Sequence, residues 1–165
     1  MAETKITYSA DTAITWTDNT LAADAWSNTA NVDNATNLYV DVLVGGFCGL
    51  DSTTAVAGET IDIYVTANYS DTATDVGGAR DAAYGLDGLQ VPDTDFIQAN
   101  VRFLTSIGLH GTPTTDMDYH WGPIGIAQMF GGVMPKDFQL LIHNNTSADI
   151  DSGDINLIGI TYTTA

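Results

Sequence analysis

The most regular pattern in the chain is the alternation of apolar and polar positions over residues 60–69, which read TIDIYVTANY. Ile61, Ile63 and Val65 fall on one side of this segment, and Asp62 falls on the other. A period of two residues is typical of a β-strand that buries one face. We therefore expect a strand here whose odd-numbered residues face a hydrophobic core.

Weaker alternation recurs along the rest of the chain, between clusters of Gly, Asp, Asn, Ser and Thr that favour turns. Further strands are expected at residues 5–9, 12–17, 37–47, 99–111, 116–132, 137–144 and 154–164. Pro123 should limit ladder bonding in its strand or place that strand at a sheet edge. Both faces of the last strand are largely apolar, which favours a central position or a subunit interface.

Three of these strands carry specific predictions about facing. The side chains expected to share a face are Leu38, Val40, Val42 and Val44 in the first, Val101, Phe103, Ile107 and Leu109 in the second, and Phe138, Leu140 and Ile142 in the third. Residues 21–36 are expected to form a polar loop, and residues 70–95 form the longest irregular stretch. Within that stretch, residues 78–86 should form a helical turn at most.

Composition favours the same fold class. Asp, Asn, Thr, Ser and Gly suit turns and strands, whereas Glu, Lys and Arg, which build exposed helix faces, are scarce. A chain of 165 residues is the usual size of one domain and can bury a core without disulfides or a metal. We therefore expect residues 1–165 to form one all-β domain. The expected architecture is a two-sheet antiparallel sandwich, jelly-roll-like, with about eight strands.

The charge balance is strongly acidic. The chain carries 21 acidic residues, all but two of them Asp, against 4 basic residues, and its formal net charge is −17. This charge repels nucleic-acid phosphates and anionic membrane surfaces, so neither is expected as a partner. Adaptation to salt is a second interpretation of the acidity, although only 15% of the residues are charged.

The apolar stretches of the sequence are too short to cross a bilayer. The N-terminal residues also lack the basic start and apolar run of a secretory signal peptide. The chain is therefore expected to be made in a cytoplasm and not exported through such a signal.

The sequence contains no evident catalytic motif. The His residues His110, His120 and His143 belong to no HExxH pattern, and neither a GxSxG nucleophile elbow nor a phosphate loop occurs. The single cysteine, Cys48, has no basic neighbour in the sequence that would activate its thiol. We interpret Cys48 as a small buried residue, and we expect the protein not to be an enzyme.

Residues 143–154, which read HNNTSADIDSGD, are the densest group of candidate metal ligands. Asp149, Asp151 and Asp154 supply carboxylates of the kind that calcium prefers. The EF-hand spacing fails, because the position that requires Glu holds Ile160. The competing interpretation is a hairpin loop between the two flanking strands, since Asp, Asn, Ser and Gly favour turns. No cofactor is required, and calcium is the one that these residues would accommodate.

A second candidate site is the run of Tyr119, His120 and Trp121. Aromatic rings can stack on sugars, and with the other two Trp residues they could line a carbohydrate site. Packing in a core or an interface is the alternative. The stretch 70–95 contains six Asp residues, which suit either a second calcium site or a segment that orders against a partner.

Two segments resemble small virion structural proteins of tailed bacteriophages. In the first, VDNATNLYVDVLV at residues 32–44, an Asn-rich loop leads into a strand of the NLYxDxLV kind. In the second, FGGVMPKDFQLLIHNNTS at residues 130–147, an FGGVxP turn precedes a strand that ends in xNxT. These motifs are structural and contain no catalytic residue to carry over.

The resemblance implies a β-sandwich component of the phage particle, and capsid decoration, or cement, is the role that we expect. Such a protein is made in the host cytoplasm, contacts the major capsid protein on the virion surface and is commonly a symmetric oligomer; we favour a trimer. An acidic chain suits the outside of a capsid better than its DNA-facing wall. The alternatives are a tail or fibre module that recognises host carbohydrate, and a calcium-stabilised β-sandwich binding protein.

Overall fold

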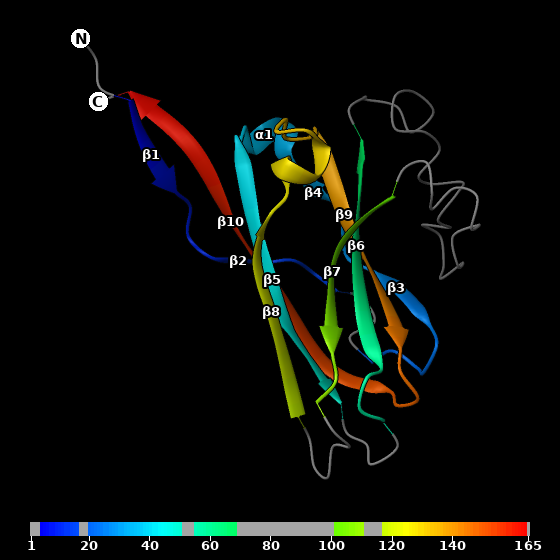
Figure 1. Ribbon diagram of the computed structural model, residues 1–165. Helices are drawn as coiled ribbons and strands as arrows, with labels where there is room; N and C mark the ends of the chain where they lie inside the picture. The colour runs from blue at the N-terminus through cyan, green and yellow to red at the C-terminus, as the bar shows by residue number, and fades with distance from the viewer. Residues whose placement is uncertain (1–3, 17–19, 51–54, 69–100, 111–116, 165) are drawn as a thin grey trace.

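The computed structural model describes residues 4–16, 20–50, 55–68, 101–110 and 117–164 (Figure 1). The elements in chain order are β1 (Thr4–Tyr8), β2 (Thr12–Ala13), β3 (Trp26–Asn28), β4 (Val32–Asp33), α1 (Asn34–Asn37), β5 (Asp41–Leu50), β6 (Thr60–Asn68), β7 (Val101–Gly108), β8 (Met117–Gly125), the 3-10 helix η1 (Ala127–Phe130), β9 (Asp137–Asn145) and β10 (Ile150–Thr164). The strands form two antiparallel sheets packed against each other, so the expected all-β sandwich is confirmed.

The strand order is that of a jelly roll. The first sheet runs β1-β10-β5-β8 with β2 also paired to β10, and the second runs β3-β9-β6-β7 with β4 also paired to β9. The pairs β1–β10, β3–β9, β5–β8 and β6–β7 are those of one long antiparallel ribbon folded between β6 and β7. Rolling up this ribbon brings β10 beside β5 and β9 beside β6. If β1 with β2, and β3 with β4, are interrupted strands, the result is the eight-strand double sheet of a jelly roll.

The hydrophobic core lies between the sheets and comes from the faces that the alternation predicts. Ile61 and Ile63 of β6, and Phe138 and Ile142 of β9, are fully buried. They pack in one cluster with Val42 of β5 from the first sheet. Burying each such side chain contributes about 1.5–3 kcal/mol, so these strands supply much of the stability.

The segment 21–36, expected to be a polar loop, contains β3, β4 and part of α1. Both short strands pair with β9 and so complete one edge of the second sheet. Asp33 caps α1, because its Oδ1 accepts a hydrogen bond of 2.7 Å from the Ala35 N–H. Strands of two or three residues are too short to show a period, and for that reason the pattern missed them.

Strand β5 begins later than expected. Leu38 ends α1 in the left-handed conformation, with a φ of 54°, and its side chain is 73% exposed. The Tyr39 N–H donates to Oδ1 of the buried Asn34, which holds this turn in place. The strand starts only at Asp41, so Leu38 and Val40 do not share the buried face of the residues that follow.

The register between β6 and β7 contains a bulge. Ile63 pairs with Thr105 and Tyr64 pairs with Phe103, so Leu104 is an extra residue in β7. A bulge changes which side chains point to the core. Leu104 is buried and Phe103 is 52% exposed, so the expected facing of Phe103 was wrong.

Strand β8 is an edge strand and contains Pro123, as expected. It ends at Gly125, before η1, so it is shorter than the predicted strand at 116–132. Strand β10 lies between β5 and the pair β1 and β2, which confirms its central position.

Cys48 lies in the core, and burial raises the pKa of its thiol to about 12. The interpretation of Cys48 as a buried residue is therefore confirmed. In the part of the chain that the structure describes, no helix is long and apolar enough to cross a membrane. The expected irregular stretch 70–95, with its helical turn and its acidic residues, lies outside the described residues.

Candidate binding surfaces

The connection at residues 143–154 is a crossing between the sheets. Strand β9 ends at Asn145 in the second sheet and β10 begins at Ile150 in the first, so the expected hairpin was wrong although a turn is present. The buried Asn144 organises this turn, because its Nδ2 donates to the carbonyls of Leu21, Ala22 and Ala148. Asn144 thereby ties the end of β9 and the turn to the segment before β3.

Each of the three aspartates of this segment accepts a hydrogen bond. Oδ1 of Asp149 accepts from the Ala23 N–H at 2.9 Å. Asp151 and Asp154 lie on β10 and accept from Ser152 Oγ and Asn156 Nδ2. Among the described residues no three His, Cys, Asp or Glu side chains are grouped so that they could hold a metal ion.

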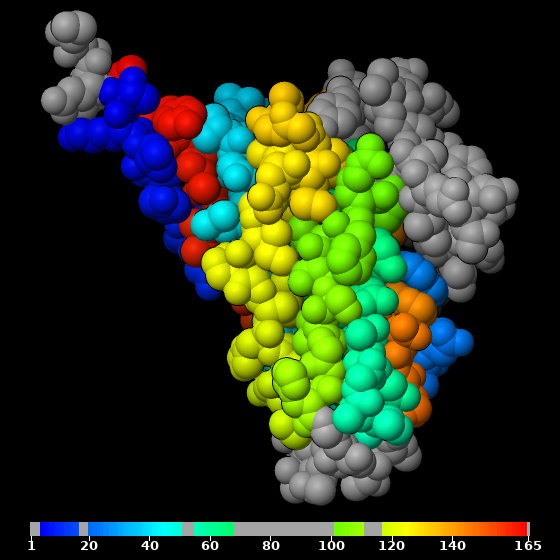
Figure 2. All heavy atoms as spheres, viewed as in Figure 1, coloured from blue at the N-terminus to red at the C-terminus, as the bar shows by residue number. Residues whose placement is uncertain are grey.

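Tyr119, His120 and Trp121 come together on the wall of a groove between the edge strands β7 and β8, with a volume of about 460 Å³. These two strands lie next to each other on the face seen in Figure 2. Tyr119 and Trp121 are buried in the core, whereas His120 is exposed. The Trp121 Nε1 is buried and meets no acceptor among the described residues. The three residues that the sequence singled out therefore line one groove, but the side chains of Tyr119 and Trp121 mainly pack in the core.

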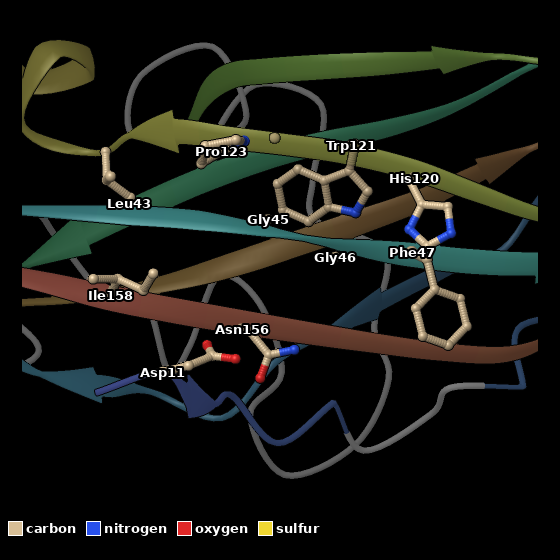
Figure 3. Close-up of a pocket in the computed structure, with 11 residues that line it drawn as sticks. Asp11, Leu43, Gly45, Gly46, Phe47, His120, Trp121, Pro123, Asn156 and Ile158 are labelled. Atoms are coloured by element: carbon tan, nitrogen blue, oxygen red, sulfur yellow. The ribbon is translucent and has the colours of Figure 1, made fainter. Parts of the chain in front are cut away.

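A second hollow, of about 440 Å³, lies on the outer face of the first sheet, over Gly45 and Gly46 (Figure 3). Leu43, Phe47 and Ile158 are among the side chains around it. Glycine is required at the floor, because a Cβ on Gly46 would clash with the Asp154 carbonyl oxygen. A Cβ on Gly122, whose φ is +80°, would lie only 2.6 Å from the Cα of Gly45.

The outer face of the first sheet continues into an arm, which we define as residues 4–8 with residues 160–164. The arm is a two-stranded ribbon that projects beyond the sandwich (Figure 1). Ile6, Tyr8 and Tyr162 are 58%, 61% and 61% exposed. The sequence predicted apolar faces for β10, but it did not show that its end lies outside the sandwich.

The outer face of the second sheet carries a row of rings that the sequence did not point to. Trp26 stacks on His143 with ring centroids 4.3 Å apart, Trp26 contacts Tyr64 at 5.4 Å, and Tyr64 meets Phe103 edge-on at 5.5 Å. Nε2 of His143 lies 3.4 Å from a carboxylate oxygen of Asp24. The only sequence signal was an aromatic residue on the polar side of the alternation in β6.

Two ionisable groups at these surfaces have shifted pKa values. Burial, together with the charge of Asp62, raises the pKa of Tyr64, so this phenol stays neutral at physiological pH. Hydrogen bonds from the Val56 and Ser147 backbone N–H groups lower the pKa of Glu59. The Glu59 carboxylate thereby joins the loop before β6 to the turn between β9 and β10.

Comparison with known proteins does not assign this chain to a family. No protein-family model matches the chain, and no curated protein matches it. What the structure defines is the class: an acidic jelly roll with exposed apolar surface on both sheets. A functional assignment therefore depends on the physical properties of these surfaces.

Proposed function

We propose that this protein is a structural component of a virus particle, which decorates the outside of the assembled head and stabilises it. The observation that carries the proposal is the jelly-roll strand order in a chain of net charge −17. Jelly rolls recur in viral capsid and lectin domains. Among them, a strongly acidic one suits a surface that faces solvent and avoids packaged nucleic acid.

The mechanism is stabilisation by mass action. A protein that binds the assembled shell, and not its dispersed subunits, lowers the free energy of the shell by an amount that grows with its concentration. It needs surface complementarity to the major capsid protein and no catalytic group. The apolar side chains on the arm and on the outer sheet faces are suitable for such contacts.

The two segments that resemble phage structural proteins contact each other, which supports their interpretation as structural motifs. Asn34, in the first segment, donates from Nδ2 to the Pro135 carbonyl in the second, and its backbone N–H donates to the Lys136 carbonyl. The glycines of the FGG turn, Gly131 and Gly132, both have positive φ. Glycine adopts this conformation without steric cost, so the geometry of the turn accounts for the two glycines of the FGG motif.

The test is the copy number of this chain in purified virus particles encoded by the same genome, measured by quantitative mass spectrometry against the major capsid protein. Decoration predicts a ratio near one or a simple fraction fixed by capsid geometry. Particles that lack the protein should lose heat or pressure resistance and regain it when the purified chain is added. A few copies per particle, or none, would contradict the proposal.

The ring row on the second sheet favours one second candidate, a tail or fibre module that recognises host carbohydrate. Phe103 and Tyr64 present ring surface beside Asp62 and Ser106, whose side chains are joined by a hydrogen bond of 2.6 Å. Rings and carboxylates are suitable partners for the apolar faces and hydroxyls of a neutral sugar. Glycan-array binding by the wild type that is lost in Phe103→Ala, and kept in the exposed control Val56→Ala, would support this candidate over decoration.

A further inference from the structure

We propose that the arm docks on a second copy of this chain, where its apolar face covers the hollow over Gly45 and Gly46. This inference goes beyond the decoration role and does not depend on it. Three features carry it: the isolation of the arm, the continuity of its apolar face with the hollow, and the distribution of charge.

The arm has little support within its own chain. Ile160 pairs with Asp41 at the start of β5, and beyond Ile160 the strand β10 has β1 as its only described neighbour. A two-stranded ribbon is at best marginally stable in water without a surface to pack on. Among the described strands, none pairs with the outer edge of β1, and an open edge of this kind can pair with another chain. The arm is therefore expected to pack its apolar face against another surface.

The arm has one apolar and one polar face. Ile6 pairs with Tyr162, and Tyr8 pairs with Ile160; residues directly opposite in a ladder point to the same side. The other side carries Lys5, Thr7, Thr161 and Thr163. The apolar face alone thus offers bulky side chains for burial.

The apolar face of the arm continues along the outer face of the first sheet to the hollow. Ile158 has the same orientation as Ile160 because the two are separated by one residue, and Ile158 lines the hollow with its pairing partner Leu43. One sheet face therefore carries both a protrusion and a recess. Copies related by rotation can bring the arm of each onto the hollow of another, either as a reciprocal pair or as a closed ring.

The distribution of charge favours a second copy as the occupant. The arm contains Lys5 and no acidic residue, so the rest of the chain accounts for all 21 acidic side chains. Two bodies of this charge repel each other wherever their acidic surfaces meet. Contact through the arm reduces that repulsion, because residues 4–8 and 160–164 carry no acidic side chain. The hollow has one acidic residue, Asp11, on its wall.

The first test is the molar mass of the full chain over a concentration series, by sedimentation equilibrium. We expect an oligomer for the wild type, and a mass that distinguishes a pair from a ring of three. Tyr162→Asp should weaken association at least tenfold. Thr163→Asp adds the same charge to the adjacent residue on the polar face and should leave association unchanged. Both variants should melt cooperatively and at the same temperature when the protein concentration is too low for association, which establishes that they are folded.

The second test locates the contact. Tyr162→Cys and Asn156→Cys proteins are mixed and treated with a short thiol-reactive crosslinker; Cys48 is buried and stays unreactive. A covalent dimer that forms only in the mixture is expected, and Thr163→Cys in place of Tyr162→Cys should give much less of it. An oligomer without this crosslink, a monomeric wild type at all concentrations, or a monomer whose arm binds purified capsids would each overturn the proposal.

Discussion

Strand β10 passes through two regions that differ in what packs around the strand, and the contrast between them is instructive. Near Ile155 and Leu157 it lies in the sandwich, with β5 beside it and the second sheet beneath, and both side chains are buried. Beyond Ile160 it lies in the arm, where β1 is its only described neighbour, and Thr163, on the same side of the strand as Ile155 and Leu157, is exposed. The alternation of side chains is the same in both regions. Burial thus depends on a second layer, which the pattern of one strand does not reveal.

The largest expected effect is the difference in stability lost when an aromatic side chain is truncated in the sandwich and in the arm. Phe138→Ala in the sandwich leaves a cavity in a fully buried site and should cost about 3–5 kcal/mol in the free energy of unfolding. Tyr162→Ala in the arm should cost no more than about 0.5 kcal/mol in a dilute, unassociated sample. Chemical denaturation monitored by fluorescence measures both. Comparable losses would show that the arm is part of the cooperative core.

The next effect concerns the polar centre of the crossing between the sheets. Asn144→Ala removes three buried hydrogen bonds, to the carbonyls of Leu21, Ala22 and Ala148, and at about 1 kcal/mol for each bond should cost about 3 kcal/mol. The neighbouring Asn145 is exposed, and Asn145→Ala should cost at most about 0.5 kcal/mol. Thermal melts of the pair give the comparison. Equal destabilisation would mean that the crossing does not depend on the buried amide.

A smaller effect concerns the floor of the hollow. Gly122→Ala combines a positive φ with a Cβ 2.6 Å from the Gly45 Cα, and should cost about 1–3 kcal/mol more than the φ penalty alone. Gly131 also has a positive φ, +74°, but open space around it, so Gly131→Ala measures that penalty. If both variants lose the same stability, β5 and β8 can separate without cost.

The smallest effect is a dependence on pH. The pKa of Glu59 is lowered in the folded state by donors from Val56 and Ser147, so ionised Glu59 stabilises the fold above its unfolded pKa. That contribution is lost as the pH falls from the unfolded pKa through the lowered folded value. The melting temperatures of the wild type and Glu59→Gln should therefore differ at pH 6 and converge in more acidic buffer. A constant difference at all pH values would contradict this assignment.

The sequence by itself determined the fold class and, for several strands, which side chains point to the core. The period of two in β6 and β9 predicted which side chains face the core, because adjacent residues of a strand point to opposite sides whatever the neighbours are. Scarcity of helix-forming charged residues predicted an all-β chain, and the absence of an activating neighbour predicted a buried Cys48. These properties depend on local geometry and composition.

Only the tertiary structure decided which faces are covered and which residues meet. The bulge at Leu104 turned Phe103 outward, and it depends on register with β6. The ring row joins Trp26, Tyr64, Phe103 and His143 from four strands, and the turn at Asn144 crosses between sheets. Such contacts join residues far apart in the chain, so their formation depends on the packing of whole sheets. For the same reason one end of β10 lies in the core and the other in an exposed arm.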